Sequence, residues 1–256
     1  MRPLSAPELL EAWERGLAGH PVQRALLLVA AACPGTPPEE LARESVGRRD
    51  GRLLTLREWT FGPRLVSVTD CPACNERLET AFDVADIVAD TVADTVADNC
   101  VPQDAWEEPL SLGVADLELS FRLPNSLDLA ALAEDKDLDG ARRRLLGRCL
   151  LTARNAEGQE VPLDRLPETA LQAVSGRMAE ADPQGDVELG LSCPACGHAW
   201  RAAFDIASFF WTEIDAWARV LLHEIHLLAS AYGWREADIL ALSPWRRRAY
   251  LELIRG

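Results

Sequence analysis

The sequence contains no long uninterrupted run of apolar residues. No stretch of about 18 such residues occurs in the chain, so we expect no membrane-spanning helix. The first residues, MRPLSAPELLEAWERG, are polar and acidic and lack the apolar centre of a secretory signal. We therefore expect the protein to remain in the cytoplasm.

Basic residues are scarce relative to acidic ones. The 256 residues include 26 Lys and Arg against 41 Asp and Glu, which gives a formal net charge of −15. Because every phosphate contact needs a basic side chain, this balance argues against general nucleic-acid binding. An acidic surface favours solubility and does not define a fold.

The sequence also lacks the motifs that mark common enzyme classes. It has no Walker loop, no G-x-G-x-x-G, no G-x-S-x-G and no convincing pair of acid and base residues. We therefore expect neither an enzymatic activity nor a small-molecule substrate.

Cysteine is present in an odd number, seven, in a chain too long to be a small disulfide scaffold. Four of the cysteines form two C-P-A-C pairs, and Cys33, Cys100 and Cys149 are scattered. Cys33 and Cys149 lie in apolar segments. Free cysteines in such surroundings are expected to be buried and unreactive.

The two C-P-A-C pairs predict one structural zinc ion. Two thiolates two residues apart on a tight turn occupy one edge of the zinc tetrahedron, and a second such turn supplies the opposite edge. The predicted ligands are Cys71, Cys74, Cys193 and Cys196. Residues 75–192 separate the pairs, a tolerable distance because the cost of loop closure grows slowly with length. Four thiolates close the coordination shell, so we expect no catalysis at the metal.

A dithiol redox pair is the alternative interpretation of each C-P-A-C. A thioredoxin-like pair begins a helix in a βαβ unit, whereas these pairs follow strand-like segments. Both copies read as strand, knuckle, strand and then A-F-D-[VI]-A. This internal repeat predicts two similar hairpins that face one another.

The predicted fold class is α+β, a zinc-ribbon-like pair of β-hairpins with a mixed insertion, flanked by N- and C-terminal helical regions. We expect an N-terminal helical region over 1–62 and a zinc-ribbon-like unit over 63–83 and 186–206. Residues 84–185 form an inserted mixed α/β segment, and 207–256 form a C-terminal helical subdomain. In the first region, GRRDGRLLTLREWTFG predicts a short helix that packs its apolar face inward and keeps its arginines in solvent.

The insertion begins with V-A-D-x repeats over residues 84–98, for which we expect a solvated helix. A helix would align Asp86, Asp90, Asp94 and Asp98 along one stripe, where like charges repel. A calcium loop is a poor alternative because the turn glycine and distal glutamate are missing.

Further along the insertion, SLGVADLELSF predicts a strand pair or one long strand, followed by a turn at Pro124-Asn125. Ser126 is expected to cap the next helix, and another helix is expected around ARRRLLGRCLLTA.

The C-terminal third holds a long helical segment with His223-Glu224-Ile225-His226. The metalloprotease motif requires histidines four residues apart, and these are three apart, so we expect packed or solvated histidines. Aromatic and arginine side chains gather near the end of the chain. Core packing is the default interpretation of the tryptophans and a solvated face is one interpretation of the arginines; our hypothesis is a partner-binding surface. Its residues are Trp234, Trp245, Arg246, Arg247 and Tyr250.

Several stretches in order resemble the T4-type phage baseplate family, which includes baseplate hub assembly chaperones and relatives encoded with contractile injection systems. The stretches are GRRDGRLLTLREWTFGPRL, CPACNERLE, FRLPNSLDLAAL, CPACGHAW and YGWREADILALSPWRRRAYLELI. The last stretch looks like a helical end of phage tail and baseplate assembly proteins. The V-A-D expansion and the complete second knuckle depart from the family pattern, so no binding residue is carried over.

The resemblance implies a non-enzymatic assembly chaperone or minor structural component of a contractile phage-like tail baseplate, which binds baseplate or tail proteins in the bacterial cytoplasm. The alternative function is a zinc-ribbon regulatory or nucleic-acid-associated protein, against which the net charge of −15 argues.

Overall fold

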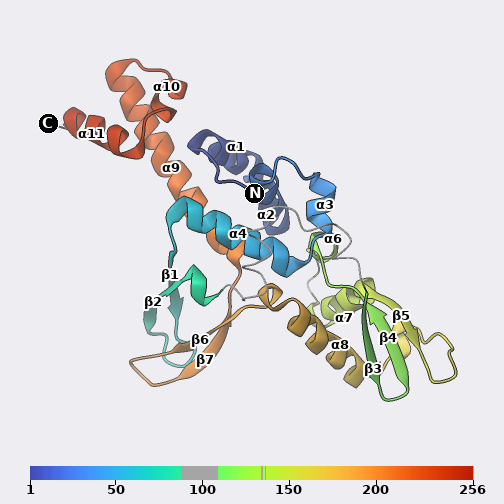
Figure 1. The fold of residues 1–256 in the computed structure, drawn as a ribbon. Helices are drawn as coiled ribbons and strands as arrows, with labels where there is room; N and C mark the ends of the chain where they lie inside the picture. Colours follow the sequence, from blue (N-terminus) through green and yellow to red (C-terminus); the bar gives the residue numbers. More distant parts are fainter. Residues whose placement is uncertain (88–108, 134, 136, 256) are drawn as a thin grey trace.

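The computed structural model describes residues 1–87, 109–133, 135 and 137–255 (Figure 1). Within them the fold is α+β, as predicted: helices surround an apolar core, and the strands form three small antiparallel sheets. Figure 1 shows the N-terminal helices at the centre, two hairpins below them, a three-stranded sheet to one side and the last helices at the opposite end. None of the described helices is long and apolar enough to cross a membrane.

Four helices make up the N-terminal part of the chain. They are α1 (Ala6–Gly16), α2 (Pro21–Ala32), α3 (Pro38–Arg43) and α4 (Val46–Phe61). Ser5 caps α1 in a capping box, in which the Ser5 N–H donates to Glu8 Oε2 over 2.9 Å. Ser45 caps α4, and its Oγ accepts from the Arg48 N–H over 3.3 Å.

The prediction that the arginines of α4 stay in solvent is wrong. None of them is more than 9% exposed: Arg48, Arg49, Arg52 and Arg57. A buried guanidinium needs carboxylate or carbonyl partners. Arg57 donates to both Glu213 carboxylate oxygens, over 2.8 and 2.7 Å, and to the Gly62 carbonyl. Arg52 donates twice to Glu44, over 3.0 and 2.9 Å. Arginines therefore tie α4 to its neighbours.

Two hairpins project from the helical body. β1 (Arg64–Asp70) pairs with β2 (Arg77–Asp83), and β6 (Glu188–Ser192) pairs with β7 (Ala199–Ala203), both antiparallel. Each hairpin is a separate two-stranded sheet. Their roots lie in the main core, where Leu65 is fully buried. Val84, directly after β2, is 3% exposed, and Ile206, three residues after β7, is 2% exposed.

The helix expected over 84–98 lies mostly outside the described residues. Its beginning is η1 (Val84–Asp86), a single 3-10 turn in which the Asp83 N–H donates to Asp86 Oδ2 over 3.0 Å. Of the predicted aspartate stripe, only Asp86 falls within the described part of the chain.

The insertion has a small core of its own, at the right of Figure 1. Its sheet has the strand order β3-β4-β5, from β3 (Leu110–Val114), β4 (Leu117–Phe121) and β5 (Leu150–Arg154). Its helical elements are α6 (Ser126–Leu132), α7 (Leu138–Cys149), η3 (Leu163–Arg165), α8 (Glu168–Ala181) and η4 (Pro183–Gly185).

Two local predictions in the insertion are wrong. The cap of α6 is Asn125 and not Ser126: its side chain accepts from the Leu127 and Asp128 N–H groups over 3.0 and 3.1 Å. The helix predicted around ARRRLLGRCLLTA ends at Cys149, and the residues after it form β5 because they pair with β4. Strand pairing across the sheet overrides the local helical pattern.

The C-terminal part consists of the long helix α9 (Ile206–Tyr232), α10 (Glu236–Leu240) and α11 (Pro244–Arg255). Gly233 ends α9 in the left-handed conformation, with φ 68°. The first half of α9, to Ala218, belongs to the main core, and the half from Leu221 packs with α10 and α11.

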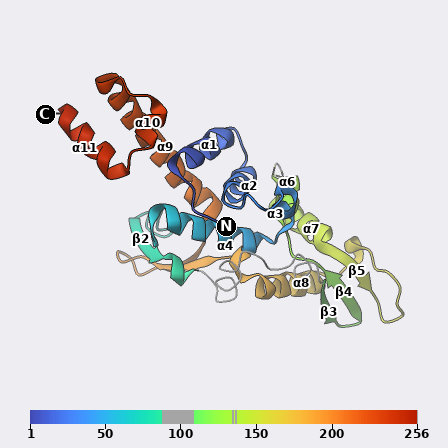
Figure 2. The same cartoon turned by 45° about the horizontal axis from the view of Figure 1, so that its top comes forward.

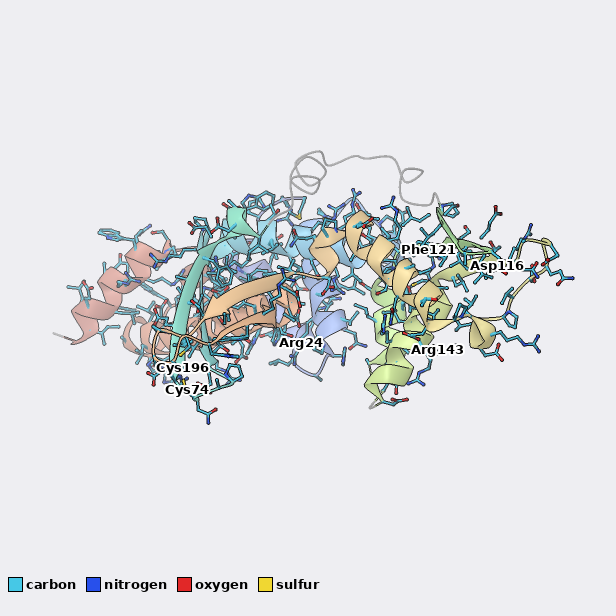
Figure 3. The ribbon with its side chains drawn as sticks, turned by 90° about the horizontal axis from the view of Figure 1, so that it is seen from below. Arg24, Cys74, Asp116, Phe121, Arg143 and Cys196 are labelled. Carbon is cyan, nitrogen blue, oxygen red and sulfur yellow. The ribbon has the colours of Figure 1, made fainter. Side chains whose placement is uncertain are left out.

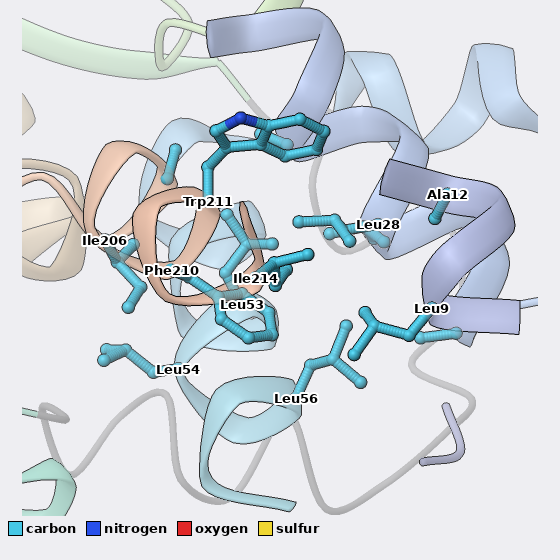
Figure 4. Close-up of a cluster of buried hydrophobic side chains, with 14 of the residues drawn as sticks. Leu9, Ala12, Leu28, Leu53, Leu54, Leu56, Ile206, Phe210, Trp211 and Ile214 are labelled. Carbon is cyan, nitrogen blue, oxygen red and sulfur yellow. The ribbon is translucent and has the colours of Figure 1, made fainter. Parts of the chain in front are cut away.

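Figure 4 shows how α9 completes the main core. Phe210, Trp211 and Ile214 of α9 face leucines of the N-terminal helices, including Leu28 and Leu53. Because α4 leads into the first hairpin and the second hairpin leads into α9, this packing brings the two hairpins to the same side of the body.

Cys33 and Cys149 are buried, as predicted. Burial raises the pKa of both thiols, that of Cys149 to about 11. Both therefore remain protonated and unreactive at neutral pH.

Candidate metal centre

The structure brings the four predicted cysteines together between the tips of the hairpins. Their sulfur atoms all lie within 4.8 Å of one another. The Sγ atoms of Cys71 and Cys196 are 3.7 Å apart, and those of Cys74 and Cys193 are 3.6 Å apart. A tetrahedral site with metal–sulfur bonds of about 2.3 Å has sulfur–sulfur distances of about 3.8 Å. A disulfide requires about 2.05 Å. The spacing therefore fits one shared metal ion.

The first knuckle is shaped by the backbone between β1 and β2. The Cys71 N–H donates to the Glu76 carbonyl over 2.9 Å, and the Asn75 N–H donates to the Cys71 carbonyl over 2.8 Å. Asn75 has a φ of 58°, in the left-handed region that asparagine tolerates better than most residues. This turn directs both sulfurs away from the strands and toward the other hairpin.

The second knuckle has the same backbone hydrogen-bond pattern as the first. The Cys193 N–H donates to the His198 carbonyl over 2.8 Å, and the Gly197 N–H donates to the Cys193 carbonyl over 2.9 Å. Gly197, with φ 72°, stands where the first copy has Asn75. A residue that tolerates positive φ is therefore required after each C-P-A-C.

The contacts between the two hairpins are reciprocal. The first cysteine of each pair, Cys71 or Cys193, is buried, and each contacts the exposed second cysteine of the other pair. The matching residues Phe82 and Phe204 meet edge to face, with ring centroids 5.5 Å apart. Figure 3 shows the exposed Cys74 and Cys196 side by side. The A-F-D repeat in the sequence thus encodes a contact between its own two copies.

The thiols perturb one another strongly. Burial acts to raise the pKa of Cys71, but backbone N–H groups of Ala73 and Cys74 outweigh it and lower the pKa to about 7. At Cys74 the backbone N–H of Glu76 favours the thiolate, yet hydrogen bonding to neighbouring thiols, first that of Cys196, raises the pKa to about 12. Four thiolates this close repel one another, so a bound cation is needed to ionise all four at neutral pH.

No other group of three or more His, Cys, Asp or Glu side chains in the described ranges is placed to share a metal ion. His198 stacks on Trp200, with ring centroids 5.9 Å apart. His223 and His226 are exposed on α9, and Glu224 between them pairs with Arg247.

The predicted partner-binding residues divide into exposed and packed ones. Trp245 is 76% exposed and Arg246 is also exposed. Trp234 and Tyr250 are half-buried and pack against each other, with ring centroids 4.9 Å apart. Arg247 is 4% exposed, and its Nε lies 3.1 Å from Glu224 Oε2. The assignment of Arg247 to an accessible surface is therefore corrected, because Arg247 holds α11 against α9.

Sequence reasoning missed the carboxylates that pair with the arginines, the partly buried Glu213 and Glu44 and the buried Asp128. Asp128 is 1% exposed and accepts from both Arg122 and Arg148. No local spacing marks these residues, because their partners are on other elements. Sequence reasoning also missed Leu253, which is 72% exposed. Its spacing of eight residues from Trp245 on a helix would have placed both on one face.

Comparison with known proteins gives one match. A family model described as T4 bacteriophage base plate protein matches residues 22–211, more than half of the 256-residue chain. The match runs from α2 into the first half of α9, so it includes both hairpins and all four cysteines. No curated protein and no solved structure matches the chain.

Proposed function

The chain is a member of the T4 bacteriophage base plate protein family, and on that premise we propose that it is a non-enzymatic assembly factor or minor structural component of a contractile phage-like tail baseplate. The observation that carries this proposal is the extent of the family match, which covers the hairpins, the insertion and most of the helical body. The protein acts in the bacterial cytoplasm, where tails assemble, and its partners are baseplate or tail proteins.

The metal at the four cysteines is zinc, and its role is structural. Four thiolates suit zinc better than calcium or magnesium, which take oxygen ligands. With four protein ligands the coordination shell has no position for a substrate or for water. The hairpins together form a zinc-ribbon-like unit, whose two knuckles are far apart in the sequence.

The centre acts as a clamp between segments that residues 75–192 separate. The hairpin of Cys71 continues directly from α4, and the hairpin of Cys193 leads directly into α9. Joining the hairpin tips fixes both ends of the insertion against the body. A component held in this way presents its parts to partners in one arrangement, which lowers the entropic cost of binding.

Deletion of the gene tests the baseplate role. Cultures that carry the deletion should yield no complete contractile tails by negative-stain electron microscopy, and the wild-type gene supplied in trans should restore them. A variant with Cys71→Ser and Cys193→Ser should restore few or none, whereas Cys100→Ser, outside both pairs, should restore wild-type numbers. Normal tails in the deletion strain would contradict the proposal.

A further inference from the structure

The end of the chain forms an arm, which we define as residues 221–255: the second half of α9, with α10 and α11. Figures 1 and 2 both show α10 and α11 at the far end of α9, beyond α1. The arm has a small core of Leu221, Ile225, Leu228, Ile239 and Leu251. It lies outside residues 22–211, so the family match says nothing about what it does.

One face of α11 packs on α9 and is fixed there. Arg247 donates to Glu224 Oε2 over 3.1 Å and to the Leu242 carbonyl over 2.8 Å, while Leu251 is 7% exposed. Tyr250 packs on Trp234. These contacts hold the helix in one orientation, so its other face is presented in a fixed way.

The other face of α11 combines large apolar side chains with arginines. Trp245 is 76% and Leu253 is 72% exposed, and Arg246 and Arg248 are exposed beside them. Trp245, Arg248 and Leu253 stand at helical positions i, i+3 and i+8, so they share one side of the helix. We call Trp245, Arg246, Arg248 and Leu253 the docking face.

The charge of α11 is opposite in sign to that of the whole chain. The chain as a whole carries −15, yet the segment 244–255 contains four arginines and one glutamate. Among the described side chains of α11, Arg247 is the only arginine in an ion pair, so the charges of Arg246 and Arg248 are not neutralised within the arm. Tryptophan and arginine are the residues that most often dominate binding energy at the centre of an interface.

We propose that the docking face binds an acidic surface of a baseplate or tail protein, with Trp245 in an apolar socket and Arg246 and Arg248 against carboxylates at its rim. This inference rests on the proposed function and adds the chemistry of the partner. An isologous contact between two copies of α11 would gather the arginines of both copies in one interface, which costs energy. A different, acidic protein is the occupant that the charges favour.

The test measures binding of the full-length protein to each purified baseplate and tail protein encoded beside its gene, by biolayer interferometry at about 50 and 200 mM NaCl. We expect one of them to bind, more weakly at the higher salt. Arg246→Glu with Arg248→Glu, and Trp245→Ala by itself, should each weaken binding at least about 30-fold. A reciprocal change of the partner's carboxylates to arginine should restore binding to the Glu variant.

A matched control separates docking from total charge. Arg15→Glu with Arg165→Glu changes the net charge equally at exposed positions elsewhere and should leave affinity within about threefold. Circular dichroism melting curves should show that every variant is folded. If the wild-type protein binds a baseplate protein and the α11 variants bind it equally well, the result contradicts the docking inference but still supports the proposed function.

Three other results overturn the inference. If the wild-type protein binds none of the baseplate or tail proteins, the proposed function falls together with it. Self-association in light scattering that the α11 variants abolish would make a second copy the occupant. Binding of duplex DNA through the same residues would make a nucleic acid the occupant.

Discussion

The paired hairpins and the helical body differ in how they bury their side chains. Strand residues of the hairpins alternate between exposed and half-buried, and only Leu65 near a root is fully buried. In the body, helices from both ends of the chain share one continuous apolar core. An isolated two-stranded hairpin is at best marginally stable in water. The comparison indicates that burial stabilises the body, whereas the hairpins bury little and, in our proposal, depend on a metal bound at their tips.

The body also contains a partly buried ion pair that joins elements far apart in the sequence, Arg57 of α4 with Glu213 of α9. In the insertion, the buried Asp128 of α6 accepts from Arg122 and Arg148. The hairpins have one ion pair among their described residues, the exposed pair Arg201–Glu188. Different changes should therefore damage each region.

Removing the metal should have the largest effect and should act on the hairpins. Apparent binding free energies of structural zinc are about 10–16 kcal/mol in zinc-finger peptides, and we propose that energy of this order holds the tips together here. In a chelator, or with Cys71→Ser and Cys193→Ser, amides of residues 64–83 and 188–203 should lose protection from hydrogen exchange. Amides of α2 should keep theirs. Equal loss in both regions would contradict the comparison.

Breaking the Arg57–Glu213 pair should destabilise the body instead. Arg57→Ala removes a side chain that is 3% exposed and leaves the partly buried Glu213 carboxylate without its partner. Loss of one member of such a pair costs about 3–5 kcal/mol, and the exposure of Glu213 favours the lower end. Urea denaturation followed by circular dichroism measures the change. Arg201→Ala, at the exposed hairpin pair, is the control and should cost less than about 1 kcal/mol.

Raising the pH from about 4 to 6 should lower the stability of the body and strengthen metal binding at the hairpins. Burial, against the opposing effect of Arg49, raises the pKa of Asp50 from 3.8 to about 6. Between these values the folded state holds a proton that the unfolded state has released, so the free energy of unfolding falls as pH rises from about 4 to 6. The expected decrease is about 3 kcal/mol. Metal binding at the hairpins strengthens over the same range, because the ligands must be deprotonated.

Asp50→Asn isolates this contribution. In a chelator, urea denaturation of the wild-type protein and of the variant between pH 4 and 7 should give curves that diverge, because the variant lacks the decrease. Parallel curves would show that Asp50 does not titrate in this window.

Local and long-range signals explain which parts of the fold the sequence could predict. The C-P-A-C spacing and the repeated A-F-D flank are local, and they predicted two facing hairpins. The arginines of α4 were wrongly predicted to lie in solvent, because the periodicity of a helix is the same whether its polar face contacts water or carboxylates. Glu213 lies far along the chain from Arg57, and no sequence motif near either residue predicts that the two form an ion pair.

The remaining errors have similar causes. Asn125 and Ser126 are adjacent residues that both cap helices well, and only the backbone of the fold selects Asn125. β5 is a strand because β4 lies beside it. At the candidate site, the spacing of the four cysteines was enough to predict them as ligands. The burial of Arg247 could not be predicted from the sequence, because it depends on Glu224 in another helix.

Changes at the docking face should have the smallest effect on stability. Trp245 and Arg246 are exposed on the side of α11 that faces away from the arm core. Trp245→Ala should therefore change the free energy of unfolding by less than about 0.5 kcal/mol. Leu251→Ala, at a buried position on the opposite side, should cost about 2–4 kcal/mol and is the matched comparison. A large loss for Trp245→Ala would mean that the face belongs to the fold.

The most direct test of the central claim is the metal content of the protein purified without added metal. Native mass spectrometry and elemental analysis should find one zinc ion per chain, with four protons displaced, and Cys71→Ser with Cys193→Ser should contain none. A wild-type chain with four free thiols and substantially less than one zinc ion would contradict the account, as would full zinc content in the variant.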